Sequence, residues 1–161
     1  MRVKELVLTI LPPIVWIGMI YFASSQPYEQ QDLRPILGEM DLSFVERWFS
    51  WVSFTYSNTV ISIENRGVTG FVEFFLRKGA HVFVFFVLGF LIFRVLKLFK
   101  IKAVPQFFLT LLFIIAFASI DEFRHFHHPN RTGLIEDVIL DTVGGLLGIS
   151  TALFLQKIRE R

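Results

Sequence analysis

The sequence predicts an all-α membrane protein: a four-span transmembrane helix bundle with an extended outer segment that contains an amphipathic interfacial helix. Two observations carry this prediction. Hydrophobic residues make up 53% of the 161 residues and charged residues only 19%, whereas about 25% of residues are charged in average soluble proteins. The apolar residues also gather in four long runs, and roughly 20 such residues in a helix cross a bilayer core of about 30 Å. An ordinary soluble domain and a disordered chain, which requires low hydrophobicity, are both excluded.

The predicted spans cover residues 6–23, 79–93, 104–120 and 134–155, within one membrane domain that takes up residues 1–161. Pro12-Pro13 kinks the first span, which a helix packed in a bundle tolerates. A signal peptide is the alternative for this run, although its apolar stretch is longer than a usual signal core. Pro105 lies in the first turn of the third span, where proline is accepted.

Basic residues at the ends of the apolar runs predict the orientation. If both termini are cytoplasmic, the short cytoplasmic segments hold nine basic residues and two acidic ones, Glu5 and Glu160. The rest of the chain holds seven basic and twelve acidic residues. The positive-inside rule therefore places residues 24–77 and 121–133 on the outer side of a bacterial-type cell membrane. Because the basic residues cluster in this way, the net charge of +2 does not indicate a nucleic-acid partner. The nine basic residues are Arg2, Lys4, Arg94, Lys97, Lys100, Lys102, Lys157, Arg159 and Arg161.

The outer segment, residues 24–77, is too long for a simple loop. Ser43 and Glu46 have the spacing of a capping box, which predicts that a helix begins there. Four residues at i, i+4, i+7 and i+11 would give this helix one largely aromatic face. An aromatic face suits either the membrane–water boundary or packing against the spans, and both alternatives stay open. Residues 59–63 favour an extended piece and residues 64–67 a turn. The four residues of the face are Phe44, Trp48, Trp51 and Thr55.

Ionisable residues concentrate at one depth, the outer end of the last three spans. Charged residues within spans usually face the bundle interior and mark function. Asp137 and Asp141 are four residues apart and share a helix face. The Gly144-x-x-x-Gly148 spacing on that face allows a close approach between helices. We therefore expect both carboxylates to point inward, toward His81, in a polar pocket that opens outward on a scaffold whose inner half is apolar.

Several chemistries fit these residues. The carboxylates would suit a divalent cation, but Glu122-x-x-His125 is only half of what a di-iron bundle needs, and we assign no metal and no cofactor. The basic residues would hold a phosphate, with His81 or His125 as general acid, base or nucleophile. A third alternative is that acids and arginines pair only to lock the bundle. The absence of cysteine excludes a zinc-thiolate site and a cysteine nucleophile. The carboxylates are Asp121, Glu122, Asp137 and Asp141, and the basic residues are Arg77, Lys78, Arg124 and Arg131.

Three stretches together resemble the VanZ-like family of teicoplanin-resistance membrane proteins. The first is Phe22-Ala23-Ser24-Ser25-Gln26-Pro27 and the second is Arg77-Lys78-Gly79-Ala80-His81-Val82-Phe83. The third comprises Asp121-Glu122-x-x-His125, Pro129-x-Arg131, Asp137 and Asp141-Thr142-x-Gly144-Gly145. The family usually has Gln at the position of His125. Gln cannot titrate and rarely binds a metal, so the other matching residues are the better candidates for chemistry.

The resemblance implies a link to lowered susceptibility to teicoplanin-type glycopeptides. Our hypothesis is that the pocket binds or acts on a cell-envelope lipid or lipid-linked phosphate, such as a polyprenyl-phosphate-linked wall precursor; whether the protein is an enzyme stays open. A non-catalytic protein is one alternative. A proton or cation transporter is another, although the inner halves of the spans offer no polar path. The catalytic candidates are His81, Asp121, Glu122, Asp137 and Asp141, and the substrate-binding candidates are Arg77, Lys78, His125 and Arg131.

Overall fold

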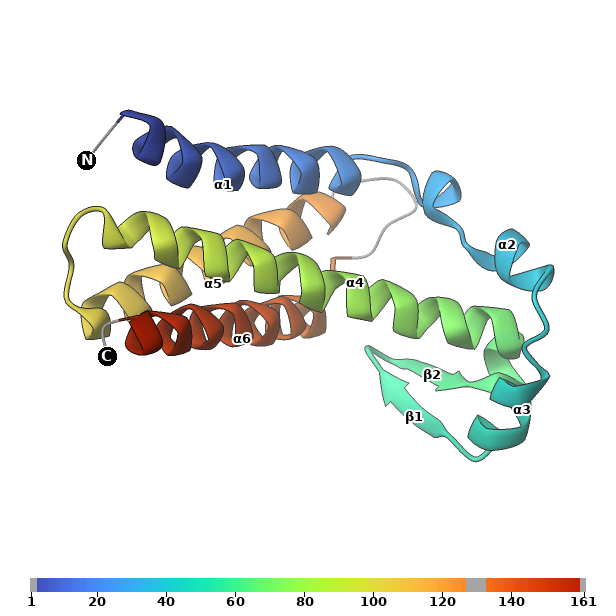
Figure 1. The fold of residues 1–161 in the computed structure, drawn as a ribbon. Helices are drawn as coiled ribbons and strands as arrows, with labels where there is room; N and C mark the ends of the chain where they lie inside the picture. The colour runs from blue at the N-terminus through green and yellow to red at the C-terminus, as the bar shows by residue number, and fades with distance from the viewer. Residues whose placement is uncertain (1–2, 127–132, 160–161) are drawn as a thin grey trace. The chain divides into compact units, whose positions relative to one another are not determined.

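The computed structural model describes residues 3–126 and 133–159, and four helices in this part of the chain are long and apolar enough to cross a membrane. The four predicted spans are therefore confirmed. Each helix extends beyond its predicted apolar run, because backbone hydrogen bonding continues through the polar residues that flank the run. The helices are α1 (Val3–Ser24), α4 (Ile63–Lys97), α5 (Ala103–Phe126) and α6 (Ile135–Arg159) (Figure 1).

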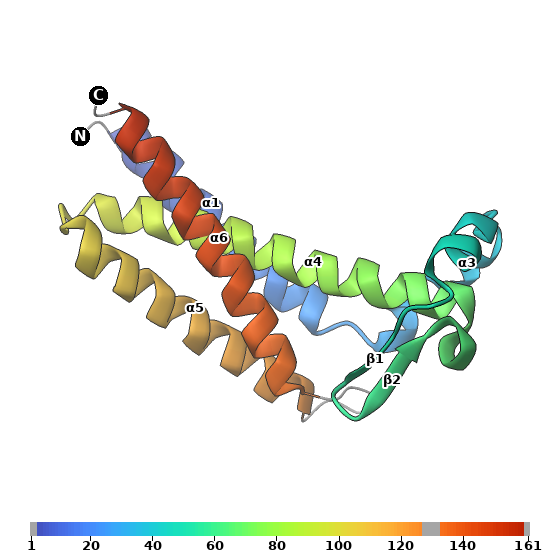
Figure 2. The same cartoon turned by 90° about the horizontal axis from the view of Figure 1, so that it is seen from below.

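The chain divides into two compact units, and helix α4 contributes to both. The bundle unit comprises residues 1–25 and 81–161, and the hairpin unit comprises residues 26–80. Within the bundle unit, α1 begins and α6 ends at the same end, where α4 also ends and α5 begins (Figures 1 and 2). An even number of spans places both termini on the same side of a membrane, and the arrangement of these helices agrees with that.

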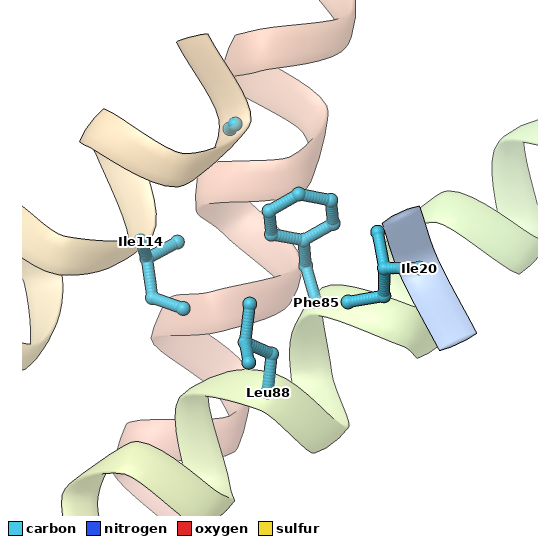
Figure 3. Close-up of a cluster of buried hydrophobic side chains, with 5 residues drawn as sticks. Ile20, Phe85, Leu88 and Ile114 are labelled. Atoms are coloured by element: carbon cyan, nitrogen blue, oxygen red, sulfur yellow. The ribbon is translucent and has the colours of Figure 1, made fainter. Parts of the chain in front are cut away.

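Apolar side chains hold α1, α4 and α5 together. Ile20, Phe85, Leu88 and Ile114 are buried in one cluster, which Figure 3 shows between these helices. The indole Nε1 of Trp16 in α1 also donates a hydrogen bond to a backbone carbonyl of α4, at 3.0 Å. The first span is therefore packed into the bundle unit by apolar side chains and a side-chain hydrogen bond.

Glycine residues bring α4 and α6 into close contact. A Cβ atom added at Gly144 would collide with the backbone carbonyl oxygen of Val82, and one added at Gly148 would collide with that of Phe86. Gly89 of α4 meets the backbone of α6 in the same way. The close approach expected from the Gly144-x-x-x-Gly148 spacing is confirmed.

The half of the bundle near the α4–α5 turn contains a polar group that the sequence analysis did not expect. Gln106 is 1% exposed, and its side-chain amide donates to the backbone carbonyl of Phe93 at 2.7 Å. Thr110 is also buried and donates to the carbonyl of Gln106 at 2.8 Å. Both groups form hydrogen bonds with backbone carbonyls, so they stabilise helix ends and turns in an apolar surrounding.

The hairpin unit contains the short helices η1 (Tyr28–Gln31), α2 (Arg34–Gly38) and α3 (Ser43–Phe49), and the strands β1 (Ser53–Tyr56) and β2 (Thr59–Ser62). The strands pair antiparallel, with Ser53 opposite Ser62 and Tyr56 opposite Thr59. Ser57 and Asn58 both have positive φ, as a tight two-residue hairpin turn requires. The extended piece expected at residues 59–63 is thus confirmed over Thr59–Ser62.

Helix α3 is shorter than predicted. It ends at Phe49, so Trp51 lies beyond it, and Thr55 lies in β1. Residues 52–56 are rich in β-branched and aromatic side chains, which favour a strand when a partner strand is available. The capping box also does not form, because the Ser43 N–H is bonded to the Asp41 carboxylate instead. The turn predicted at residues 64–67 is wrong as well, since α4 already begins at Ile63 and only Gly67, at φ 69°, interrupts it.

We predict that Gly148→Ala destabilises the bundle unit, because the new methyl group would meet the α4 backbone rather than a movable side chain. Overpacking of this kind costs about 1–3 kcal/mol. Thermal unfolding of the purified protein in detergent measures the effect. Gly18→Ala in α1 is the matched control, since a Cβ there meets no atom within 4 Å. Equal melting temperatures for the two variants would contradict the close α4–α6 contact.

Candidate functional site

Hydroxyl and ionisable side chains from four helices meet in the bundle unit, where α1 and α5 end and α6 begins. We name this group the polar cluster. Six of its members are buried and His81 is partly buried; Asp141 is 0% exposed and Asp137 is 6% exposed. The expectation that the two acids of the last span point inward is therefore met. The polar cluster comprises Ser24 of α1, His81 of α4, Asp121, Glu122 and His125 of α5, and Asp137 and Asp141 of α6.

Helix spacing explains how α5 and α6 present these residues. Glu122 and His125 lie three residues apart in α5, as do Asp121 and Arg124, and such pairs lie side by side along a helix. Residues 121–126, which follow the predicted third span and were expected on the outer side, continue this helix as its last turns. The polar residues of α5 therefore lie in a regular α-helix, which fixes their backbone positions.

A chain of hydrogen bonds links Asp121, Ser24, His125 and Glu122. The Ser24 hydroxyl donates to Oδ1 of Asp121 at 2.6 Å and lies 2.7 Å from Nε2 of His125. On the other side of the imidazole ring, Nδ1 lies 3.2 Å from Oε1 of Glu122. The second oxygen of Glu122 accepts the backbone N–H of Leu134 at 2.9 Å. These hydrogen bonds therefore fix the relative orientation of the Ser24 hydroxyl, the His125 imidazole and the Glu122 carboxylate.

This chain of hydrogen bonds also constrains the protons. A serine hydroxyl has one proton, and Ser24 gives it to Asp121 when that carboxyl is ionised. Nε2 of His125 must then carry a proton, which it donates to Ser24. The contact between Nδ1 and Glu122 needs one further proton, on either the ring or the carboxyl. With Asp121 ionised, His125 is therefore a hydrogen-bond donor to Ser24 and does not accept the Ser24 proton.

Arg124 borders the polar cluster and carries a permanent positive charge. Its guanidinium lies 3.4 Å from Oδ1 of Asp121 and donates to the Ser25 hydroxyl at 2.6 Å. The same group stacks over the ring of Tyr21, 3.9 Å from its centre. Its side chain remains 30% exposed, so it can reach a ligand outside the buried part of the polar cluster.

His81 and Asp141 join α4 to α6 at the polar cluster. Nδ1 of His81 lies 3.2 Å from Oδ1 of Asp141. An oxygen of Glu122 lies within 4.8 Å of an oxygen of Asp141, and Asp137 lies one turn before Asp141 in α6. One ligand atom from each of His81, Glu122 and Asp141 fits within 4.8 Å of the others, so these three residues could hold a metal ion.

Two predicted substrate-binding residues belong to the hairpin unit, and a third lies outside the described residues. Arg77 belongs to the hairpin unit, where it pairs with the buried Glu73 at 2.9 Å. Lys78 belongs to the same unit, with its ammonium group 4.6 Å from the centre of the Tyr56 ring. Arg131 lies outside the described residues, as does Pro129 of the same motif. His125, the fourth predicted substrate-binding residue, lies in the polar cluster.

The sequence analysis assigned no role to Ser24. Its partners Asp121 and His125 lie about a hundred residues away in the chain. A serine after an apolar run indicates only that the span ends there. One signal was present: the first span ends at the same depth at which the third acquires its polar residues. A hydroxyl at that depth is a candidate partner for buried acids and imidazoles.

The sequence was compared with models of known protein families, and one family matches most of the chain. The model of the VanZ/LLP1 family matches residues 9–156 and therefore includes every member of the polar cluster. A search of curated proteins finds no match. A search of solved structures also finds no match. Because the family match covers most of the sequence and the four spans are present, this chain belongs to the VanZ/LLP1 family.

Proposed function

We propose that this protein of the VanZ/LLP1 family binds the phosphate head group of a cell-envelope lipid at its polar cluster and performs acid–base chemistry there. One observation carries the proposal: three helices bring acids and imidazoles together, with a hydroxyl from a fourth, at one end of a hydrophobic bundle unit. Ionisable residues within membrane spans are costly and mark functional sites by default.

Depth in the membrane and the neighbouring cation favour a lipid phosphate. The polar cluster lies where helices end, which is the depth at which lipid head groups lie. Arg124 provides a partly exposed guanidinium, whose N–H donors match phosphate oxygens. A polyprenyl phosphate would place its phosphate at this depth and keep its tail in the hydrocarbon. An effect on teicoplanin susceptibility would follow if that lipid carries a wall precursor.

The hydrogen bonds of Ser24, His125 and Glu122 support acid–base chemistry. An imidazole held between a hydroxyl and a carboxylate is positioned to take up or release a proton as a general base or acid. The distances of 2.7 Å and 3.2 Å are within reach for proton transfer in an enzyme without bound substrate. His81 and Asp141 supply a second imidazole–carboxylate pair.

We expect the protein in lipid nanodiscs to bind polyprenyl phosphate more tightly than the polyprenol with the same tail, because only the phosphate engages the polar cluster. Arg124→Gln and His81→Ala should each weaken phosphate-dependent binding by about tenfold or more, because each removes a group that can donate to a phosphate oxygen, and one lost charge-assisted hydrogen bond has this scale. Binding is measured by displacement of a labelled lipid. If His125 is the general base that activates water for hydrolysis of the phosphate ester, with inorganic phosphate and the polyprenol as products, His125→Gln should abolish phosphate release while the lipid still binds.

Glu136→Gln is the control for these variants, since Glu136 lies in the first turn of α6 and is not a member of the polar cluster. Thermal unfolding is recorded for every variant. If the charges only lock the bundle, Arg124→Gln and His81→Ala will lower the melting temperature and the lipids will bind equally with or without phosphate. That result would contradict the proposal.

The proposal includes an orientation in which both termini are cytoplasmic and the polar cluster faces outward. Because the chain has no cysteine, single introduced thiols report on it directly. Glu39→Cys should react with a membrane-impermeant maleimide in intact cells, whereas Lys102→Cys should react only after permeabilisation. Both positions are exposed, so accessibility within the protein is matched. The opposite labelling pattern would reverse the orientation.

A further inference from the structure

We propose that His81, Glu122 and Asp141 form a binding site for a divalent transition-metal cation of the Mn²⁺ or Zn²⁺ type. The three residues come from three different helices, α4, α5 and α6. One ligand atom from each lies within 4.8 Å of the other two. The site is therefore built by the packing of the bundle unit and not by a local sequence motif. It does not depend on the proposed lipid.

The carboxylate of Asp141 carries the proposal. Its residue is 0% exposed, and its Oδ1 is 3.2 Å from the His81 ring. Its Oδ2 is buried and has no hydrogen-bond partner among the residues that the structure describes. A buried acceptor without a partner costs about 1–3 kcal/mol, and more when the group is charged. A cation bound at this carboxylate removes that cost.

The charge of the surroundings favours a cation as well. An oxygen of Glu122 lies within 4.8 Å of an oxygen of Asp141, and Asp137 lies one helix turn before Asp141 on the same face of α6. Arg124, the nearest arginine in α5, is directed to Asp121 and Ser25. Several carboxylates thus face one buried region where water screens their repulsion poorly, and a divalent ion compensates their charge.

The donor set selects the kind of ion. One imidazole and two carboxylates suit Mn²⁺ or Zn²⁺, whereas Mg²⁺ and Ca²⁺ prefer oxygen ligands throughout. Metal–ligand bonds of about 2.0–2.2 Å place two ligand atoms of one ion about 3–4.4 Å apart. The ligand atoms of His81, Glu122 and Asp141 lie within 4.8 Å of one another, so the three side chains need to move only slightly closer to bind an ion. Three protein ligands leave further coordination positions for water or a ligand oxygen.

The neighbours of Glu122 support its role as a ligand. Oε1 contacts His125, and Oε2 accepts the Leu134 N–H. Such outer contacts fix the direction of a ligating carboxylate and are typical of metal sites in proteins. A carboxylate oxygen has a second lone pair, so these hydrogen bonds leave room for a bond to the ion.

The test uses the purified full-length protein in detergent, stripped with a chelator and then titrated with Mn²⁺ or Zn²⁺ without lipid. We expect one ion of either metal per chain and a higher melting temperature on binding. Asp141→Asn and Glu122→Gln should each weaken binding by more than about tenfold. Glu136→Gln, the same change of carboxylate to amide in α6, should leave the affinity unchanged. Lipid binding is measured separately, so a failure of the metal site is distinguishable from a failure of the proposed function.

A second measurement tests the coordination of the metal in the wild-type protein, so its main result does not depend on the folding of a variant. Electron spin echo spectroscopy of the Mn²⁺-loaded wild-type protein should reveal modulation from a directly coordinated imidazole nitrogen, which His81 supplies. His81→Ala should remove that modulation. The proposal is overturned if wild type binds neither metal at submillimolar concentration, or if Asp141→Asn and Glu122→Gln bind as wild type does. Binding without coordinated nitrogen would likewise overturn it.

Discussion

Within a bilayer, an ionisable side chain must find its partners inside the protein, because hydrocarbon offers none. Helix α6 carries Asp137 and Asp141 in its first two turns, and both are buried. The same helix approaches α4 through Gly144 and Gly148. The lack of side chains at these glycines brings the two backbones together. The contact between His81 and Asp141 therefore depends on the same close packing that shields their charges from lipid.

Hydrogen-bond partners are distributed unevenly within the polar cluster. Ser24 contacts both Asp121 and His125, and Glu122 uses both of its oxygens. A fully satisfied polar network of this kind makes a protein rigid. Asp141 differs, since its Oδ2 has no hydrogen-bond partner in the described part of the chain. This oxygen is the group on which the proposed metal site depends.

Length and hydropathy were sufficient to predict the four spans, because crossing a bilayer places a strict demand on both. The inward direction of Asp137 and Asp141 was also predictable, since helical periodicity puts them on the glycine face. Helix α3 was predicted too long because the aromatic spacing fits a helix, while the pairing of β1 with β2 favours strands instead. The role of Ser24 was not predictable, because no local pattern indicates a partner about a hundred residues away.

The meeting of α4 and α6 at the polar cluster is tested most directly by cross-linking, because the chain has no native cysteine. A short bifunctional thiol reagent should bridge the double variant His81→Cys/Asp141→Cys, giving the intact mass of one bridging reagent per chain. His81→Cys/Ile139→Cys is the control, since Ile139 is 61% exposed on α6. Two separate adducts on the first pair, or equal bridging of both pairs, would contradict the convergence of His81 and Asp141.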